Sequence, residues 1–341
     1  MDGTSLLFLL FIAVMVLVGA FFLLAPRPTL NPEPPRTRVP DDHGPADLVD
    51  WLKAHEAAHR HVVEGAEASI VWAGQAATRT PLCLLYLHGF SASRQETAPL
   101  CDQVAAELGA NLVYTRLAGH GLAESAMEAT AEEWIASALD GWEIASRLGE
   151  KVVIVATSTG APLAVWLCQH ITNLDQVHSL VFLSPNFKIR NPFGFMLTWP
   201  LADRWISKLV GEEHSWEPEN EQAARYWTHR YSVNAVIEMQ KIVDWARKYA
   251  RTDLDIPLLT VYMEGDPTIS DRAAVAFHRR WGSKHKLLKR VPIDDTNPQH
   301  VFVGSITAPH RLDWTTTTLL NFIRGLHPGT VYLTLPITGT P

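Results

Sequence analysis

Short apolar segments rich in β-branched residues alternate with helix-forming segments from about residue 46 onward. Continuous apolar runs are typical of strands buried on both faces, and strands separated by helices favour a mostly parallel sheet covered on both sides. The sequence therefore predicts an α/β fold with its reactive groups at the carboxyl ends of the strands. The predicted strands are Leu82–Leu87, Asn111–Arg116, Val152–Thr157, Ser179–Ser184, Pro257–Met263 and Lys286–Val291, and the predicted helices are Gln95–Leu108, Ala131–Leu148, Thr159–His170 and Asp271–Trp281.

One stretch interrupts this alternation. Residues 185–251 contain no convincing strand but are rich in helix formers, and they hold five of the twelve tryptophans. We interpret them as a helical cap inserted between two strands. For any single tryptophan, packing inside the cap is the simpler explanation, but together these aromatics can form an apolar wall over a binding site.

The composition excludes several classes of protein. In 341 residues, 47% are hydrophobic and the net charge is −7, which excludes a disordered chain and gives no support for nucleic-acid binding. Three cysteines cannot build a disulfide framework; Cys83 and Cys168 lie in apolar runs and are predicted to be core thiols, as suits a reducing compartment. No Cys/His cluster has zinc-ligand spacing, and we expect neither a metal nor a cofactor.

The first residues carry a membrane-length segment. Leu6 to Ala25 is a run of twenty residues without a charged or polar side chain, and a helix of that length spans about 30 Å, the thickness of the bilayer hydrocarbon. The competing interpretation is a cleaved signal peptide. No Lys or Arg precedes the run, and the nearest small-residue site, Val18–Ala20, is followed by four large apolar residues. We therefore expect an uncleaved single-pass anchor over residues 1–25.

The flanking sequence predicts an orientation and a linker. Arg27, Arg36 and Arg38 follow the run and Asp2 is the only charged side chain before it, so the positive-inside rule favours a cytoplasmic C-terminal domain. Residues 26–45 contain seven prolines, which predicts an extended spacer that holds the domain away from the lipid. The predicted organisation is thus an anchor, a Pro-rich linker over 26–45, and a domain over 46–341 with its cap at about 185–251.

The passage from Val152 to Ala161 carries the clearest chemical signal. A buried strand runs directly into a helix, with Ser158 at the junction. A sharp strand-to-helix turn exposes the serine hydroxyl and requires small residues two positions before and after it, here Ala156 and Gly160. The usual pattern has glycine at both positions. A plain helix N-cap is the alternative role for this serine, but the context favours a nucleophile.

A serine nucleophile needs a base that is oriented by a carboxylate. His300 follows the last predicted strand through a polar loop and is the preferred base, with His310 as the alternative. Asp266 lies in the turn that ends the strand after the cap, and it is the preferred acid. Glu264 and Asp295 are the alternative carboxylates, and an ordinary Asp-Pro turn is the alternative role for Asp266.

A further loop completes the set. His88, Gly89 and Phe90 follow an early strand, and the backbone N–H groups of Phe90 and Thr159 are placed to form an oxyanion hole. We expect His88 to shape this loop rather than to carry a proton. The segment from Leu117 to Gly121 is expected to be a structural loop beside the site.

These motifs, with Arg116–Gly121 and Gly265-Asp266, resemble those of serine hydrolases of the α/β-hydrolase superfamily, near lipases, carboxylesterases and monoacylglycerol lipases. The resemblance covers about residues 80–325. It implies an eight-stranded, mostly parallel sheet with a cap after the sixth strand. It also implies Ser158 as nucleophile, His300 as base, Asp266 as orienting acid, and Phe90 and Thr159 as oxyanion donors. Ala156 and the N-terminal anchor depart from the family pattern.

The function expected from these residues is hydrolysis of carboxylic esters through an acyl-enzyme. The aromatic cap and the anchor suggest apolar, lipid-like esters. Thioester hydrolysis and acyl transfer use the same groups and remain alternatives, as does a catalytically silent binding protein on the same fold. A serine in place of an aspartate nucleophile argues against dehalogenase and epoxide-hydrolase chemistry. The oligomeric state is left open.

Overall fold

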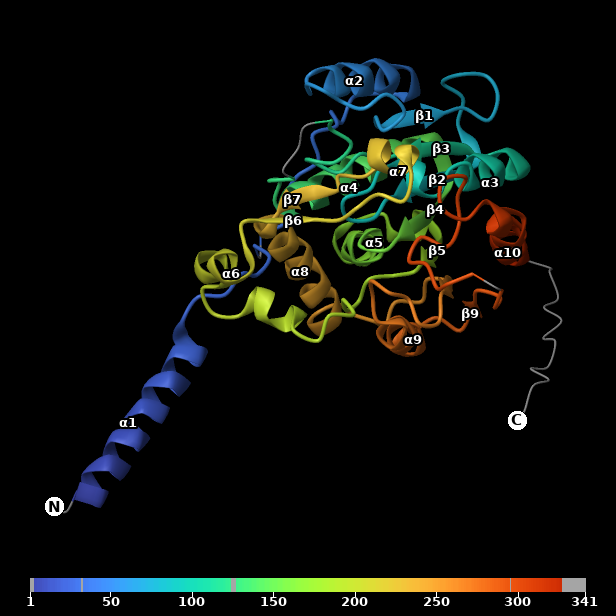
Figure 1. The fold of residues 1–341 in the computed structure, drawn as a ribbon. Coiled ribbons are helices and arrows are strands. Elements are labelled where there is room, and N and C mark those ends of the chain that lie inside the picture. The colour runs from blue at the N-terminus through green and yellow to red at the C-terminus, as the bar shows by residue number, and fades with distance from the viewer. Residues whose placement is uncertain (1–2, 32, 124–126, 295, 327–341) are drawn as a thin grey trace.

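The computed structural model describes residues 3–31, 33–123, 127–294 and 296–326. Its centre is a seven-stranded sheet in the order β1-β3-β2-β4-β5-β8-β9. All neighbouring strands are parallel except β1, which runs antiparallel to β3 at one edge (Figure 1). The strands are β1 (Ser69–Val71), β2 (Thr80–Leu87), β3 (Asn111–Tyr114), β4 (Gly149–Thr157), β5 (Val177–Leu183), β8 (Leu258–Tyr262) and β9 (Lys286–Arg290). The predicted α/β fold is confirmed.

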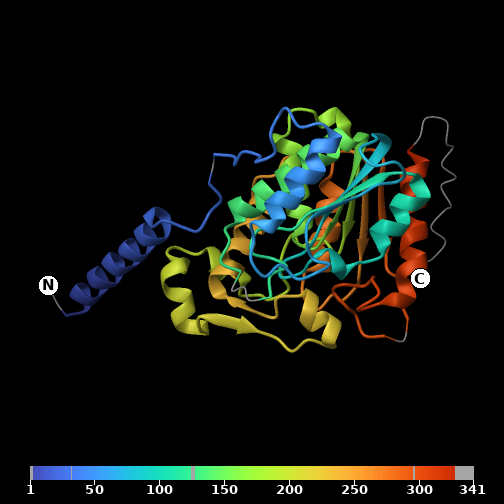
Figure 2. The same cartoon turned by 90° about the horizontal axis from the view of Figure 1, so that it is seen from above.

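Helices cover both faces of the sheet. Helices α3 (Leu100–Leu108) and α10 (Leu312–Gly325) pack on one face, and α4 (Ala131–Leu148), α5 (Gly160–His170) and α9 (Asp271–Arg280) pack on the other (Figure 2). Helix α2 (Pro45–Ala57) packs against α4. The short 3₁₀ turns are η1 (Arg94–Glu96), η2 (Leu174–Gln176), η3 (Gly194–Thr198) and η4 (Pro309–Arg311).

The alternation of side chains along the central strands explains why these runs are apolar throughout. On β2, Cys83 and Leu85 face the α4 and α5 side, while Leu84 and Tyr86 face the α3 and α10 side, and all four are fully buried. A strand covered on both faces has no solvent-exposed side to make polar. All three cysteines are free and buried, as predicted for Cys83 and Cys168.

The sheet has seven strands among the described residues, where the resemblance implied eight. The chain ahead of β2 forms helix α2 and a single three-residue strand, and Pro45 at the first turn of α2 favours that helix start. The cap therefore follows the fifth strand of the chain rather than the sixth. One predicted helix is also shorter than expected: Gln95–Leu108 is divided by Pro99, and α3 begins only at Leu100.

The cap lies between β5 and β8 and is mainly helical, as predicted. Its helices are α6 (Ala202–Val210), α7 (Glu221–Tyr226) and α8 (Val233–Lys248). It also contains two strands that the sequence did not predict, β6 (Glu213–Ser215) and β7 (Arg230–Ser232), paired antiparallel. Each is three residues long and β6 is fully exposed, so neither shows the apolar alternation by which strands are recognised.

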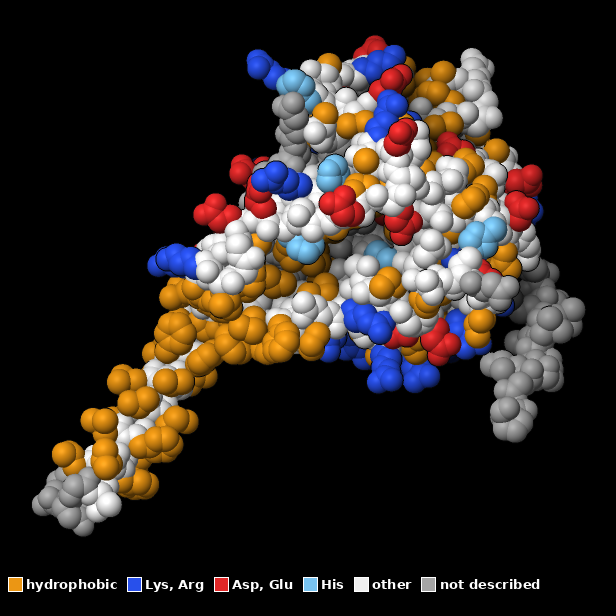
Figure 3. Space-filling model, in the orientation of Figure 1, with side chains coloured by type: hydrophobic (Ala, Val, Ile, Leu, Met, Phe, Trp, Pro, Cys, Tyr) orange, Lys and Arg blue, Asp and Glu red, His pale blue; other side chains and the backbone are white. Residues whose placement is uncertain are grey.

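Helix α1 (Gly3–Leu24) extends away from the domain with its side chains exposed (Figures 1 and 3). Within the described residues, it is the helix long and apolar enough to cross a membrane, a property shared by membrane spans and signal sequences.

The Pro-rich segment that follows α1 lies against the domain. Asp140 on α4 accepts hydrogen bonds from the backbone N–H of Arg38 and the hydroxyl of Thr37, at 2.7 and 2.8 Å, and forms an ion pair with the Arg38 guanidinium. Val39 is buried in the core. The prolines keep this segment free of helix and strand, but these contacts attach it to α4.

Candidate active site

Ser158 occupies the tight turn between β4 and α5. Its backbone φ is +51°, a conformation that non-glycine residues rarely adopt, and its N–H donates to the carbonyl of Leu183 at 2.9 Å. Helix α5 passes so close to β2 that a Cβ on Gly160 would lie 2.2 Å from the Leu87 carbonyl oxygen. Glycine is therefore required two positions after Ser158, whereas the methyl group of Ala156 fits two positions before it, fully buried in the core.

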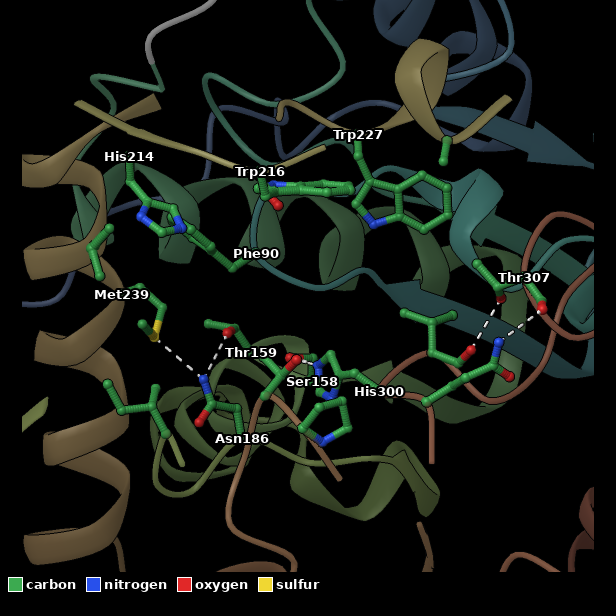
Figure 4. Close-up of a pocket in the computed structure, with 18 of the residues that line it drawn as sticks. Phe90, Ser158, Thr159, Asn186, His214, Trp216, Trp227, Met239, His300 and Thr307 are labelled. Carbon is green, nitrogen blue, oxygen red and sulfur yellow. Dashed lines mark hydrogen bonds between the residues drawn. The ribbon is translucent and has the colours of Figure 1, made fainter. Parts of the chain in front are cut away.

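The structure brings Ser158, His300 and Asp266 together. His300 Nε2 lies 2.8 Å from Ser158 Oγ, and His300 Nδ1 lies 2.8 Å from Asp266 Oδ2. A carboxylate can only accept, so Nδ1 carries the proton and Nε2 is left to accept from the serine hydroxyl. Ser158 follows β4, Asp266 follows β8 and His300 follows β9, all at the carboxyl edge of the sheet. Figure 4 shows Ser158 and His300 side by side.

Asp266 is held in place by its own loop. It is fully buried, and its second oxygen, Oδ1, accepts from the backbone N–H groups of Thr268 and Ile269 at 2.8 and 3.0 Å. One carboxylate oxygen is thus held by backbone donors, and the other faces His300. An ordinary Asp-Pro turn would not require the contact with His300.

The alternative site residues lie elsewhere. His310 pairs with Asp294 at 3.2 Å, and nearly half of its side chain is exposed. Glu264 pairs with Arg290 on the surface. Asp295 lies outside the described residues.

Phe90 and Thr159 both line the pocket beside Ser158. Across the described part of the chain, no acceptor is found for the backbone N–H of either residue. Two unpaired amides next to a serine hydroxyl are the arrangement that stabilises a developing oxyanion.

His88 shapes the loop that carries Phe90, as expected. It is buried; its Nε2 accepts from the backbone N–H of Leu117 at 3.1 Å, which leaves Nδ1 to donate to the Gly89 carbonyl at 2.9 Å. Burial lowers the pKa of His88 to about 4, so the imidazole is neutral and can make both bonds.

Sequence reasoning missed Glu96. Its carboxylate Oε1 accepts from the N–H of Gly89 at 2.7 Å and from the hydroxyl of Tyr86 at 2.8 Å. The side chain is buried, and burial raises its pKa to about 7. In the sequence it stands in a polar stretch typical of a surface loop, and only the fold shows that this stretch turns back behind Gly89.

Sequence reasoning also missed two residues at the end of β5. Asn186 donates its side-chain amide to the Thr159 hydroxyl at 3.3 Å. Arg190 donates to the carbonyls of Gly265 and Asp266, at 2.9 and 2.6 Å, and so joins the start of the cap to the loop of the acid. The first bond holds the residue after Ser158, and the other two hold the loop that carries Asp266.

A cavity of about 680 Å³ opens above Ser158, within the size range of small-molecule sites. Its floor includes Ser158 and His300, and its roof includes Trp216 and Trp227 of the cap (Figure 4). The other cap tryptophans pack elsewhere: Trp199 against Phe195, Trp205 beside α8, and Trp245 against the main core. Among the described residues, no group of three or more His, Cys, Asp or Glu side chains could hold a metal ion.

Comparison with known proteins assigns this chain to a family. The family model described as serine aminopeptidase S33 matches residues 80–293. A thermostable monoacylglycerol lipase from Bacillus sp. (strain H-257) is 29% identical over 91 residues, which are 26% of this chain and 36% of the lipase. The chain thus spans about a third of the length of that curated relative.

Solved structures share the fold at low identity. A structure from the work on the metagenome-derived lipolytic enzymes LipS and LipT superposes with a TM-score of 0.62 at 18% identity, covering 77% of this chain and 99% of its own. The monoacylglycerol lipase of Paleococcus ferrophilus gives 0.56 at 16% identity, covering 76% and 98%. Residues 80–293, which the family model matches, include β2 to β9, the cap and the Ser158 turn. The chain belongs to the serine aminopeptidase S33 family and has the α/β-hydrolase fold of these solved lipolytic enzymes.

Proposed function

We propose that this protein is a membrane-anchored serine hydrolase that cleaves apolar carboxylic esters through an acyl-enzyme on Ser158. The observation that carries the proposal is the position of His300, which lies 2.8 Å from both Ser158 Oγ and the Asp266 carboxylate. The same proposal includes Phe90 and Thr159 as oxyanion donors.

In the proposed reaction, Ser158 Oγ attacks the ester carbonyl while His300 Nε2 takes the hydroxyl proton. Asp266 keeps the imidazole in the required tautomer and stabilises its positive charge. The carbonyl oxygen becomes an oxyanion that accepts from the Phe90 and Thr159 amides. Its collapse expels the alcohol, which receives the proton from His300. Water then attacks the acyl-enzyme with His300 again as base, releasing the acid and regenerating Ser158.

The pocket supports an apolar acyl group. Beyond the catalytic side chains its walls are largely hydrophobic and include Trp216, Trp227, Val236 and Met239. A hydrocarbon chain gains free energy by leaving water for such a wall, by about 0.8 kcal/mol for each buried CH₂ group. We therefore include lipid-derived esters in the proposal.

Helix α1 supports the anchor. Its apolar length matches the bilayer, and most of its large apolar side chains are exposed in the described structure. The excess of arginine after the helix favours a cytoplasmic domain.

Peptide substrates are a second candidate, favoured by the description of the family and by two carboxylates in the pocket wall, Glu217 and Glu219. Acidic side chains at this position suit the ammonium group of a peptide N-terminus. Both candidate substrates require Ser158 as the nucleophile. An ester with an apolar acyl group requires a hydrophobic pocket wall, whereas a peptide N-terminus requires an acidic one.

Hydrolysis of esters and of an amino-acid anilide by the full chain in detergent micelles distinguishes the two candidates. We expect kcat/KM for p-nitrophenyl esters to rise with acyl length from acetate to decanoate, and alanine p-nitroanilide to be cleaved at least about 10²-fold more slowly. Ser158→Ala should lower ester turnover by at least about 10³-fold. Ser69→Ala is the matched control, because the Ser69 hydroxyl on β1 is buried without a hydrogen-bond partner in the described structure. Faster cleavage of the anilide would contradict the ester assignment.

A further inference from the structure

Large apolar side chains are exposed on two neighbouring elements of the cap. Phe193 and Phe195, at η3, are 66% and 48% exposed, and Leu209 and Val210, at the end of α6, are 69% and 60% exposed. Single exposed apolar residues are ordinary, but a group of them on adjoining elements marks a surface that contacts something apolar. We call these four residues the cap face. Elements α6 and η3 pack against each other.

The cap face adjoins the end of the membrane-length helix. Phe22, in the last turn of α1, packs edge-to-face on Trp199 with ring centroids 5.3 Å apart, and Trp199 in turn packs on Phe195 at 5.4 Å. The N–H of Leu201, just before α6, donates to the carbonyl of Pro26 at 2.8 Å. Figure 3 shows the apolar side chains of α1 continuing onto the edge of the domain where Figure 1 labels α6.

This contact sets the depth of the cap. If α1 spans a bilayer, Phe22 lies at the boundary between hydrocarbon and headgroups, and the side chain that touches it lies at the same depth. Tryptophan is enriched at that boundary, which suits Trp199 and its neighbour Trp205. Helix α6 also carries two exposed basic residues, Arg204 and Lys208, and one exposed acidic residue, Asp203. An apolar edge with basic residues beside it is typical of a helix that lies in a membrane interface.

The same segment leads to the active site. Ile189 and Asn191 line the pocket of Ser158, and Phe193 follows two residues later on the outside. A wall of the pocket is therefore continuous with the cap face.

We propose that the cap face lies on the lipid bilayer beside α1, so that the pocket takes its ester from the membrane rather than from water. This inference rests on the proposed function, since it requires both the anchor and an apolar ester. The partner is a bilayer surface, because the face is continuous with the segment that enters the bilayer.

The test uses the full chain reconstituted in phosphatidylcholine vesicles. Phe195→Cys and Leu209→Cys are each labelled with nitrobenzoxadiazole, and Ile293→Cys, 79% exposed and three residues after β9, is the control. Figure 1 shows β9 on the side of the domain away from α1. The native cysteines are buried and should not react. We expect nitroxide-labelled lipid to quench the dye at 195 and 209 at least about threefold more than at 293. Equal quenching at all three positions would overturn the proposal.

An activity measurement gives an independent readout. The Phe193→Ser/Phe195→Ser variant should hydrolyse p-nitrophenyl acetate in the same vesicles within twofold of the wild-type rate. It should hydrolyse bilayer-dissolved p-nitrophenyl palmitate at least about fivefold more slowly. Unchanged palmitate hydrolysis would contradict entry from the membrane. If the wild type hydrolyses neither ester, the proposed function is wrong while the quenching result still decides the docking. If the esters are hydrolysed without quenching, the docking alone is wrong.

Discussion

The N–H of Gly89 donates to the buried Glu96 carboxylate at 2.7 Å, one residue before the proposed oxyanion donor Phe90. A Cβ on Gly89 would lie 3.0 Å from Glu96 Oε2 and 3.1 Å from Ser158 Cβ, so the glycine separates the carboxylate from the nucleophile. Glu96 thus fixes the backbone from which the Phe90 amide projects. His88 fixes the same backbone from the Gly89 carbonyl.

Removal of this support should lower the rate of the chemical step. We predict that Glu96→Ala lowers kcat by about 10- to 100-fold with little change in KM, because the oxyanion forms only in the transition state. Glu96→Gln keeps an oxygen acceptor for Gly89 and should stay within about threefold of wild type. The matched control is Gln95→Ala, which removes a bond to the Gly65 carbonyl instead. A rise in KM alone in Glu96→Ala would assign Glu96 to substrate binding.

The same carboxyl group should make stability depend on pH. Burial raises the pKa of Glu96 from 4.5 to about 7, so the folded chain holds this proton more tightly than the unfolded chain. Its contribution to stability is fully present below pH 4.5 and is lost as the pH rises through 7. The loss is on the order of 3 kcal/mol. Urea unfolding at pH 5 and pH 8 should therefore show wild type losing stability relative to Glu96→Gln.

Two buried histidines make the stability of the fold depend on pH in the opposite direction. Burial lowers the pKa of His88 to about 4 and that of His120 to about 3, so their contribution is present above pH 6.5 and is lost on acidification. Wild type and Glu96→Gln both contain these two histidines. The difference between their stability-versus-pH curves therefore reports on Glu96 alone. Parallel curves would show that the Glu96 proton is not linked to folding.

Gly160 should not tolerate a side chain. A methyl group there would meet the Leu87 carbonyl oxygen at 2.2 Å and the His88 carbonyl oxygen at 3.0 Å, and backbone cannot rotate away as a side chain can. We predict that Gly160→Ala lowers the free energy of unfolding by about 1–3 kcal/mol and displaces the turn of Ser158. Gly74→Ala is the control, because a methyl group there has no neighbour within 4 Å. Equal melting temperatures for the two variants would contradict the close packing of α5 on β2.

The Pro-rich segment should detach when its acceptor is removed. Asp140→Ala deletes the hydrogen bonds from Thr37 and Arg38 and should cost about 2–3 kcal/mol of stability. Trypsin should then cleave after Arg36 and Arg38 several-fold faster than in wild type. The control is Asp50→Ala, an exposed carboxylate on α2. Unchanged cleavage would mean that these bonds do not hold the segment on α4.

The sheet and the Ser158 turn could be predicted because they depend on local sequence. The run Val152–Ala156 is apolar at every position, and a strand buried on both faces explains that pattern directly before a serine and a helix. The carboxyl-edge rule then brought Asp266 and His300 to the same place, although more than a hundred residues separate each from Ser158.

Glu96, Arg190 and the course of residues 26–45 could not be predicted, because their roles depend on contacts between distant segments. Glu96 resembles a surface residue until its loop folds behind Gly89. The prolines indicate an extended chain but do not indicate that Asp140 lies beside Arg38. Strands β6 and β7 were missed since three residues are too few for a period to appear.

The most direct test of the central claim is the mass of the covalent adduct formed with a fluorophosphonate. The full chain in micelles should gain one phosphonyl group, located by peptide mass on Ser158, and Ser158→Ala should gain none while keeping the wild-type melting temperature. His300→Gln should be labelled at least about 10²-fold more slowly, because the base at 2.8 Å is gone. An adduct on another residue, or labelling of Ser158→Ala at the wild-type rate, would contradict the account.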